Sequence, residues 1–451
     1  MKIQRISQFQ GYLQFPSFEQ SYIKHLTTFS ASDLCKIHEA IPWDKLIKLI
    51  GLRDYKKGPK SKFSPKGKLA LMFLKHYACC SDRKLIDQLN ANIHYQIFCD
   101  IYIPPGQGLK NFKMVSEIRT EVGQSLDIRS AQHVLSDHWR SYINDLNSIS
   151  CDATCYESFI RYPTDIKLLW ESVTWTYLQL RIISKKLGQR MLRTKYKKWS
   201  HRYSNYCKMR KKTRKRAIPL NRALLKLLYK INTELKGLEE HVECEQPLRY
   251  WKRRQTIEQI YEQQSQKFYE NRNPKHRIVS IDKPYIRPIV RGKEVKKVEF
   301  GAKVHKLQIG GISFIEHLSF EAFNEGTRLQ KTIYTSQQLT HTKVRLLGAD
   351  GIYATNANRR YVTSKSIRTD FKRKGKPSKH KVHQKQLSKM ITKERASRLE
   401  GSFGTDKEHF LLNRIKARSE LNEKLWIFLG IHTSNALKIG RRMDNQRAVA
   451  A

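Results

Sequence analysis

Three acidic residues stand where their side chains could do chemistry together. Asp152 follows the alternating run SISC, Asp350 follows the apolar run VRLLGA, and Glu400 lies on a helix-like segment fifty residues further on. Both runs predict short strands, so the two aspartates are predicted at strand ends, which converge at one edge of a mixed sheet. The three carboxylates could then meet around two Mg²⁺ ions about 4 Å apart, the arrangement that two-metal phosphoryl transfer requires.

Each of these acids also has an ordinary explanation. A lone Asp after a strand is usually a cap or a turn former, and a lone Glu on a helix is usually an exposed acid. Glu394 competes with Glu400 as the third acid, because six residues of helix rotate by about 600°, or 120° away from the same face. Gly401 and Gly404 weaken a helix unless another backbone comes close to it.

A lysine accompanies the glutamate on the predicted helix. Glu400 and Lys407 are seven residues apart, almost two full turns, so they share a face. The carboxylate could hold metal while the ammonium group meets a DNA phosphate.

The whole chain is strongly basic. Its 451 residues are enough for two or three domains, and 87 Lys and Arg against 40 Asp and Glu give a formal charge of +47. A compact fold with this surplus would repel itself unless a polyanion neutralised it, and nucleic acid is the commonest polyanion partner.

The cysteines and the N-terminus indicate a cytoplasmic location without a membrane span. The eight cysteines form no CxxC pair, which argues against a zinc site or a disulfide framework and favours reduced thiols. The first twenty residues hold no apolar signal region, and runs such as LALMFL are too short to span a bilayer.

Helices are predicted on both sides of the first aspartate. Residues 30–146 show short helical patterns, with a start at Ser81–Asp82 and a stop at Pro104–Gly106, which suit a helix-turn-helix-like module or any small helical bundle. The chain is predicted helical again from about 166 to 273, where RALLKLLYKINTELKGLEEHV is the clearest amphipathic run.

Strands are predicted beyond Lys275. The runs RIVSID, YIRPIV, KKVEFGAKVHKLQIGG and ISFIEHLSF are rich in β-formers, and a last helical region follows the acid-bearing segments. The segment 363–389 is basic and broken by Gly and Pro, so it is predicted to be a mobile arm or loop near DNA.

One basic segment inside the second helical region carries aromatic residues. Residues 193–217 hold twelve Lys or Arg, no acid, and four aromatics, which are Tyr196, Trp199, Tyr203 and Tyr206. The cations are interpreted as a surface for a phosphate backbone. For the aromatics two alternatives stay open, stacking on bases or packing into the core.

The chain resembles the DDE transposases of bacterial insertion sequences, and five segments in the family's order carry this resemblance. They are FSPKGKLALMFLKHYACCSDRKLIDQLNANIHYQIFCDIYIP, DATCYESFIRYPTDIKLLWE, the pair IRPIVRGKEVKKVEFGAKV and FEAFNEGTRLQ, GADGIYATNANRRY, and RLEGSFGTDKEHFLLNRIKARSE with the tail KLWIFLGIHTSNALKI.

The resemblance implies an α/β fold, a ribonuclease H-like mixed sheet flanked by helices. A helical DNA-binding domain would cover 1–146, the catalytic domain 147–440 with a basic helical insertion at about 166–273, and a tail 441–451. Asp152, Asp350 and Glu400 would be both the catalytic residues and the metal ligands, for two Mg²⁺ ions that Mn²⁺ can replace.

The resemblance also implies contacts with DNA. Some family members place Tyr and Arg seven and four residues before the glutamate, where this chain has Lys393 and Ala396. Arg395 and Arg398 are therefore expected to take over phosphate contacts beside Lys407. In the basic segment, the same role is expected of Lys211, Lys212, Arg214 and Lys215.

The expected function is a transposase that binds the terminal inverted repeats of its element, cleaves the DNA and transfers the strands. Its partners would be double-stranded element ends and target DNA, and it would act as a homodimer in the bacterial cytoplasm, associated with the nucleoid. One alternative is a non-catalytic sequence-specific DNA-binding protein derived from a transposase. Another is an RNA-binding protein, although no RNP-type segment and no GxxG clamp context is found.

Overall fold

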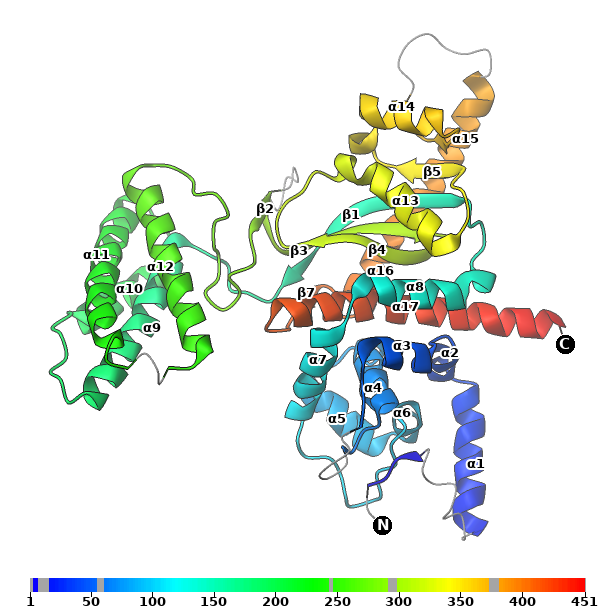
Figure 1. Ribbon diagram of the computed structural model, residues 1–451, viewed down its shortest axis with the longest axis horizontal. Coiled ribbons are helices and arrows are strands. Elements are labelled where there is room, and N and C mark those ends of the chain that lie inside the picture. Colours follow the sequence, from blue (N-terminus) through cyan, green and yellow to red (C-terminus); the bar gives the residue numbers. More distant parts are fainter. Residues whose placement is uncertain are drawn as a thin grey trace. The chain divides into compact units, whose positions relative to one another are not determined.

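The computed structural model describes residues 3–6, 16–54, 61–242, 246–290, 298–372 and 381–450. The chain divides into two compact units (Figure 1). The first unit comprises Met1–Ser158, Ala302–Ser319 and Phe323–Ala451, and the second comprises Phe159–Gly301 and Phe320–Ala322. The fold is mixed α/β, as predicted.

The first unit begins with short helices. They are α1 (Pro16–Ser30), α2 (Asp33–Glu39), α3 (Trp43–Ile50), α4 (Pro65–Tyr77), α5 (Asp82–Ala91), α6 (Ile93–Phe98), α7 (Lys113–Ser125) and α8 (Ile128–Trp139), with the 3-10 turn η2 (Arg140–Tyr142) after them. The predicted start of α5 is confirmed, because the Ser81 side chain accepts a hydrogen bond from the Lys84 amide. Helix α6 ends at Phe98, before the predicted stop.

A helix from the end of the chain packs against this group. Helix α17 (Glu420–Ala450) contacts α2, α4 and α7. Its Trp426 ring lies 4.9 Å from the Arg119 guanidinium, and the ring centroids of Trp426 and His76 are 5.3 Å apart. The N-terminal helices thus share their core with the other end of the chain.

A mixed sheet forms the rest of the first unit. Its strands are β1 (Ser148–Ser158), β3 (Val298–Ile309), β4 (Ile312–Ser319), β5 (Leu346–Ala349), β6 (Arg368–Thr369) and β7 (Arg414–Ile415). The order is β4-β3-β1-β5-β6, and β7 pairs with the end of β1. Strand β5 is parallel to β1, and β6 is parallel to β5. Strands β3 and β4 form an antiparallel hairpin.

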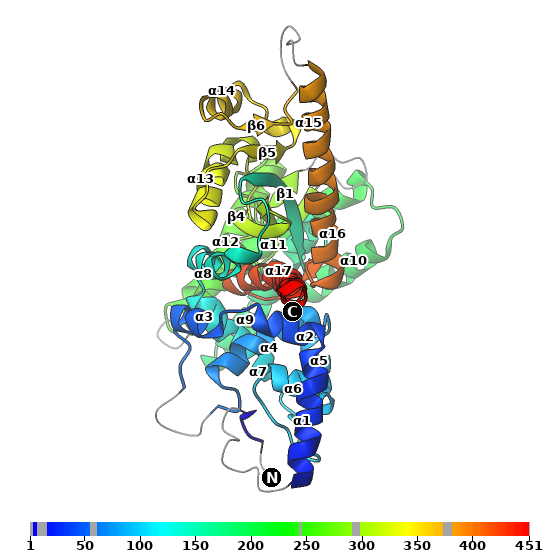
Figure 2. The ribbon, with the colours of Figure 1, turned by 90° about the vertical axis from the view of Figure 1, so that its right-hand side faces the viewer.

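Helices and turns connect and cover these strands. They are η4 (Glu325–Arg328), α13 (Leu329–Thr340), η5 (Gly351–Tyr353), α14 (Asn356–Ser364), α15 (Lys381–Glu394), the π-helical turn η6 (Arg395–Glu400) and α16 (Gly401–His409). In Figure 2, α15 and α16 run as one continuous helix beside β1 and β5. The prediction of an arm over 363–389 is wrong for 381–389, which belong to α15, and residues 373–380 lie outside the described residues.

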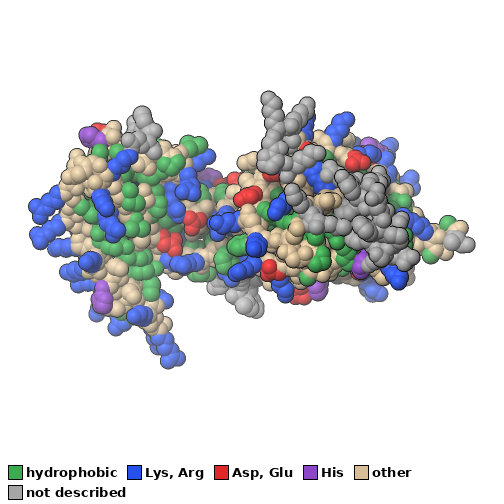
Figure 3. All heavy atoms as spheres, turned by 90° about the horizontal axis from the view of Figure 1, so that it is seen from below, with side chains coloured by type: hydrophobic (Ala, Val, Ile, Leu, Met, Phe, Trp, Pro, Cys, Tyr) green, Lys and Arg blue, Asp and Glu red, His purple; other side chains and the backbone are tan. Residues whose placement is uncertain are grey.

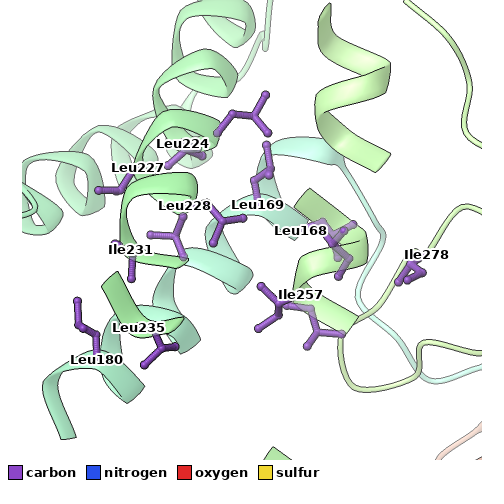
Figure 4. Close-up of a cluster of buried hydrophobic side chains, with 14 of the residues drawn as sticks. Leu168, Leu169, Leu180, Leu224, Leu227, Leu228, Ile231, Leu235, Ile257 and Ile278 are labelled. Carbon is purple, nitrogen blue, oxygen red and sulfur yellow. The ribbon is translucent and has the colours of Figure 1, made fainter. Parts of the chain in front are cut away.

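The second unit is helical, as predicted for 166–273. It holds α9 (Asp165–Lys186), α10 (Tyr196–Lys208), α11 (Arg214–Glu239) and α12 (Leu248–Tyr269), and β2 (Pro288–Val290) pairs with the first residues of β3. Leucines and isoleucines of α9, α11 and α12 interdigitate in its core (Figure 4).

The predicted strand RIVSID is wrong. Residues 277–282 form no strand, because Ile278 and Ile281 are buried against the helical core instead. The Ile278 amide donates to Gln263 Oε1 over 2.9 Å, so its hydrogen bond needs no neighbouring strand. In the described part of the chain, none of the helices has the length and apolar character needed to cross a membrane.

Candidate active site

Strand pairing brings the two aspartates together. Strand β1 pairs in parallel with β5, with Cys151 opposite Ala349, so the next residues in this register are Asp152 and Asp350. Neighbouring strands lie about 4.8 Å apart, so Asp152 and Asp350 are neighbouring residues at the end of β5.

The predicted position of Asp152 at a strand end is wrong. Strand β1 continues to Ser158, so Asp152 lies within the strand and only Asp350 follows one. The extension pairs Glu157 with Arg414 and Ser158 with Ile415 of β7, which comes from far along the chain. A local pattern cannot show such a partner.

The loop after Asp350 is fixed by buried polar side chains. Tyr353 Oη lies 2.8 Å from His305 Nε2, and His305 Nδ1 lies 3.1 Å from Glu316 Oε2. Burial alone would raise the pKa of Glu316, but hydrogen bonds from His305 and Arg328 hold this pKa below its ordinary value. These contacts anchor the turn that begins at Asp350.

The helix that carries Glu400 crosses the same face of the sheet. A Cβ atom on Gly348 of β5 would lie 3.0 Å from Ile391 Cγ2 and 3.7 Å from Arg395 Cβ, so the glycine allows α15 and η6 to approach the strand. Glu400 is the last residue of the π-helical turn η6. Such turns are rare in proteins as a whole, but those that occur often lie at functional sites.

The electrostatics of Asp152 favour a nearby cation. Burial raises the pKa of this carboxyl to about 6, and the charges of Glu325 and Asp350 add to the rise. The Ala153 amide, 2.8 Å from Oδ1, and the charge of Arg395 act in the opposite direction. A carboxylate whose negative charge is disfavoured in this way gains stability from an added positive charge.

Arg395 connects Glu400 to another carboxylate. Its Nη1 lies 3.4 Å from Glu400 Oε1 and its Nε lies 3.9 Å from Asp370 Oδ2, while Asp370 Oδ1 accepts from the Ala349 amide over 3.1 Å. The Arg395 side chain is 13% exposed and that of Glu400 is 49% exposed. Burial raises the pKa of Asp370.

The competing acid, Glu394, has a different partner. Its Oε1 lies 2.7 Å from Arg398 Nη1, and both side chains are about half exposed. Arg395 contacts Glu400, and its charge also acts on Asp152. Glu394 instead forms an ion pair with a residue one turn along its own helix. This difference favours Glu400 as the third acid.

The residues fit divalent metal ions in kind, and in part by position. Asp152, Asp350 and Glu400 supply the oxygen ligands that Mg²⁺ takes. As the side chains of the described residues are placed, no three His, Cys, Asp or Glu stand close enough together to hold a metal ion. In this arrangement Glu400 is paired with Arg395 rather than with the two aspartates.

The remaining predicted DNA contacts near the site lie on this same helix. Lys407 Nζ donates to Thr154 Oγ1 of β1 over 3.2 Å, so its ammonium group faces the strand that carries Asp152. Arg395 and Arg398 are both in ion pairs with glutamates. Phosphate binding by these three residues stays a prediction.

Sequence reasoning missed several residues around the site. Glu325 lies 2.6 Å from Lys303 Nζ, and no sequence pattern points to it or to Asp370. A buried cluster beside the helix that carries Glu400 consists of Lys306, Asp406 and Tyr156. A signal was available for two of them: Tyr156 shares the two-residue period of Asp152, and Lys306 is a charge in the apolar run VHKLQI.

The basic segment lies in the second unit, on its surface. Lys211 and Lys212 lie between α10 and α11, Arg214 and Lys215 begin α11, and all four are exposed. Lys and Arg side chains gather on this unit, at the left of Figure 3. No acidic residue occurs between Glu171 and Glu234.

The aromatic residues of the segment pack inside the unit. Trp170 of α9 stacks on Tyr196 and Tyr203 at centroid distances of 5.3 and 4.9 Å, and Tyr177 stacks on Tyr196 at 3.9 Å. Trp199 and Tyr206 also pack against the hydrophobic core. Of the two alternatives, packing into the core is the one that the structure supports, and the rings attach α10 to α9.

These observations define a mixed α/β protein with an acidic site on a sheet face and a basic helical unit. A family model described as Transposase domain (DUF772) matches residues 22–121, which cover most of the N-terminal helices. The match supports a transposase family, whose members as a class cleave DNA. No curated protein and no solved structure matches the chain.

Proposed function

We propose that the protein is a DDE transposase that binds the terminal inverted repeats of its insertion sequence and catalyses metal-dependent strand cleavage and strand transfer. The observation that carries the proposal is the arrangement on the sheet face. The parallel register of β1 and β5 places Asp152 beside Asp350, and the helix with Glu400 crosses the same face.

The sheet supports a ribonuclease H-like catalytic fold. An antiparallel hairpin, β3 and β4, lies on one side of β1, and the parallel strands β5 and β6 lie on the other. This order, with Asp152 on the central strand β1 and Asp350 directly after its parallel neighbour β5, brings two of the three predicted acids to one part of a mixed sheet.

The acidic residues would act together on phosphodiester bonds. Asp152, Asp350 and Glu400 would hold two Mg²⁺ ions, or Mn²⁺ in their place, which would supply the positive charge for activating an attacking oxygen and stabilising the leaving oxygen. Asp152 is already placed where a positive charge is favoured. The Asp350 side chain is exposed, so a DNA strand can reach it.

Glu400 and Arg395 would change partners during this step. When the Glu400 carboxylate turns toward the aspartates, its ion pair with Arg395 breaks, and the guanidinium group becomes available to a DNA phosphate. Arg398 at the half-exposed surface of the same helix and Lys407 facing β1 would add phosphate contacts.

The second unit would hold double-stranded DNA by contacting the phosphate backbone of the DNA. Its exposed cations, including Lys211, Lys212, Arg214 and Lys215, neutralise phosphates, while its aromatic rings are used internally. Base readout is assigned to the N-terminal helices, which the transposase family model matches. A homodimer would handle the two element ends together.

Substitution of the three acids tests the proposal. Asp152→Asn, Asp350→Asn and Glu400→Gln keep the size of each side chain but remove the negative charge that a divalent cation requires. Each variant is expected to lose end nicking in Mg²⁺, by a factor of about 10³ or more, as for removal of other central catalytic groups. Binding to terminal-repeat duplex, which relies on cations and the N-terminal helices, is expected to stay near wild type.

Glu394→Gln is the matched control for Glu400→Gln, because it changes the same chemical group on the same helix. It is expected to nick at the wild-type rate. Wild-type nicking by Glu400→Gln would remove Glu400 from the site. Nicking by all three acid variants at the wild-type rate would overturn the DDE mechanism. Absence of nicking by the wild-type protein, with end binding retained, would leave the non-catalytic DNA-binding alternative.

A further inference from the structure

A buried polar cluster ties the Glu400 helix to two strands. Lys306 of β3 is fully buried, and its Nζ donates to Asp406 Oδ2 over 2.7 Å and to Ser402 Oγ over 2.9 Å, both on α16. Asp406 Oδ2 also accepts from Tyr156 Oη of β1 over 2.7 Å. We refer to Lys306, Asp406, Ser402 and Tyr156 as the Lys306 cluster.

The cluster fixes both the rotation of α16 about its axis and its position along that axis. Ser402 and Asp406 are four residues apart, so they share one helix face, and a single ammonium group contacts both. A slip of the helix by one residue would rotate it by about 100° and shift it by about 1.5 Å, which would break these contacts. Glu400 is two residues before Ser402 and would move with it.

The π-helical turn makes this second attachment necessary. Helix α15 is already docked where Ile391 and Arg395 approach Gly348 of β5. A π turn holds an extra residue compared with an α-helical turn, so the part of the helix after it has a new rotational phase. Docking of α15 therefore does not by itself fix the direction in which Glu400 points.

Strand β1 connects the cluster to the site. Tyr156 is four residues after Asp152, and Thr154, which accepts from Lys407, lies between them, so all three side chains are on one face of the strand. The face that presents Asp152 is thus the face that holds α16 in place.

We propose that the Lys306 cluster is a positioning device that holds Glu400 in the phase required to meet Asp152 and Asp350, and this inference rests on the proposed function. Its side chains are buried and contact one another, so Lys306, Asp406 and Tyr156 would act through Glu400, as positioning residues. Stability alone would not require this arrangement, because well-packed apolar residues of similar volume often replace a buried ion pair without loss of stability.

Two variants test the inference in the full-length protein. Tyr156→Phe removes one hydrogen bond to Asp406, and the double variant Lys306→Met/Asp406→Leu replaces the ion pair by apolar side chains of similar size. Ser158→Ala is the matched control, because Ser158 lies on the same face of β1 and its buried hydroxyl donates over 2.6 Å to Glu423 of α17 rather than to α16.

The first measurement is amide hydrogen exchange of residues 400–409 without metal. Both test variants are expected to lose protection there by about tenfold or more while α7 stays unchanged, because only the docking of α16 is weakened. The second is binding of Mn²⁺, followed by the paramagnetic resonance signal of the free ion. Its affinity is expected to fall about 10- to 100-fold in the test variants, as is usual when the supports of metal ligands are removed.

The outcomes separate this inference from the proposed function. Wild-type exchange and wild-type Mn²⁺ affinity in both test variants would overturn it, as would equal losses in Ser158→Ala. If the double variant fails to fold, Tyr156→Phe decides alone. If the wild-type protein itself binds no Mn²⁺ and nicks no DNA, the proposed function fails, and the exchange measurement still decides whether the cluster sets the position of α16.

Discussion

A group of cations in the first unit and a group in the second are placed in different ways. In the first unit, buried or partly buried cations meet carboxylates: Lys306 contacts Asp406, Lys303 contacts Glu325, and Arg328 contacts Glu316. In the second unit, residues 172–233 contain nineteen Lys or Arg and no acid, and most of these cations are exposed around an apolar core. The cations of the first group order the side chains around the candidate site, while those of the second group are exposed to solvent, where the proposed function places DNA.

Two buried histidines of the first unit contrast with the exposed histidines of the second. His76 and His432 of the first unit are buried, and burial lowers the pKa of each to about 3. His76 Nδ1 lies 3.0 Å from the Phe410 carbonyl oxygen, and His432 Nε2 lies 3.2 Å from Gln132 Oε1. In the second unit His201, His241 and His276 are exposed.

Acid is therefore expected to weaken the first unit more than the second. A histidine with a folded pKa near 3 and an unfolded pKa near 6.5 binds its proton only on unfolding, so its stability contribution is complete above pH 6.5 and falls as the pH drops toward 3. Each of the two costs about 2 kcal/mol between pH 7 and pH 5. Hydrogen exchange at the two pH values should show protection lost first in α4, α8 and α17.

His432→Gln isolates one of these protons. Its free energy of unfolding should change with pH by about 2 kcal/mol less than that of the wild type over the same interval, whatever the other groups contribute. An unchanged pH dependence would show that His432 is protonated equally in both states. Earlier loss of protection in α9–α12 would reverse the comparison between the units.

The cations of the second unit are expected to act on binding rather than on folding. Replacing Lys211, Lys212, Arg214 and Lys215 by Ala removes exposed charges, so the melting temperature should stay near wild type. Binding to every duplex should weaken, and the slope of log affinity against log salt should flatten by up to about 0.9 for each lost phosphate contact.

A matched set of exposed cations in the same unit provides the control. Lys236 and Lys252 lie near Glu240 and Glu258 on another part of the unit, around a shared surface pocket. Their replacement by Ala should leave the salt slope unchanged. If the four-residue variant also keeps the wild-type slope, those cations form an ordinary solvated surface.

The local patterns of the sequence predicted the strands of the candidate site better than the geometry around them. The alternating and apolar runs before Asp152 and Asp350 indicated strands, and β1 and β5 are strands in parallel register. The length of β1 was wrong because its last residues pair with β7. RIVSID failed because burial of its isoleucines against helices satisfies the same apolar pattern as a strand.

Other features depend on contacts between distant segments. No spacing in the sequence indicates the π-helical turn that ends at Glu400 or the ion pair of Glu400 with Arg395. The aromatic residues of α10 illustrate the same limit. Their spacing suited bases or a core equally, and Trp170 and Tyr177 of another helix made the difference.

The smallest expected effect concerns two glycines on α16, the helix that directly follows Glu400. A Cβ atom on Gly401 or Gly404 would meet nothing within 4 Å, so nothing in the described part of the chain comes close enough to require glycine at either position. Alanine at each should stabilise α16 by about 1 kcal/mol, since glycine is that much poorer in a helix. Gly237 of α11 in the second unit is equally unobstructed, and Gly237→Ala should give a similar gain.

The variants are expected to differ in activity. If a DNA backbone approaches the first unit beside Glu400, Gly401→Ala/Gly404→Ala should raise the melting temperature and lower end nicking, whereas Gly237→Ala should raise the melting temperature alone. Equal nicking by both variants would mean that DNA reaches the acidic residues from another side of the helix.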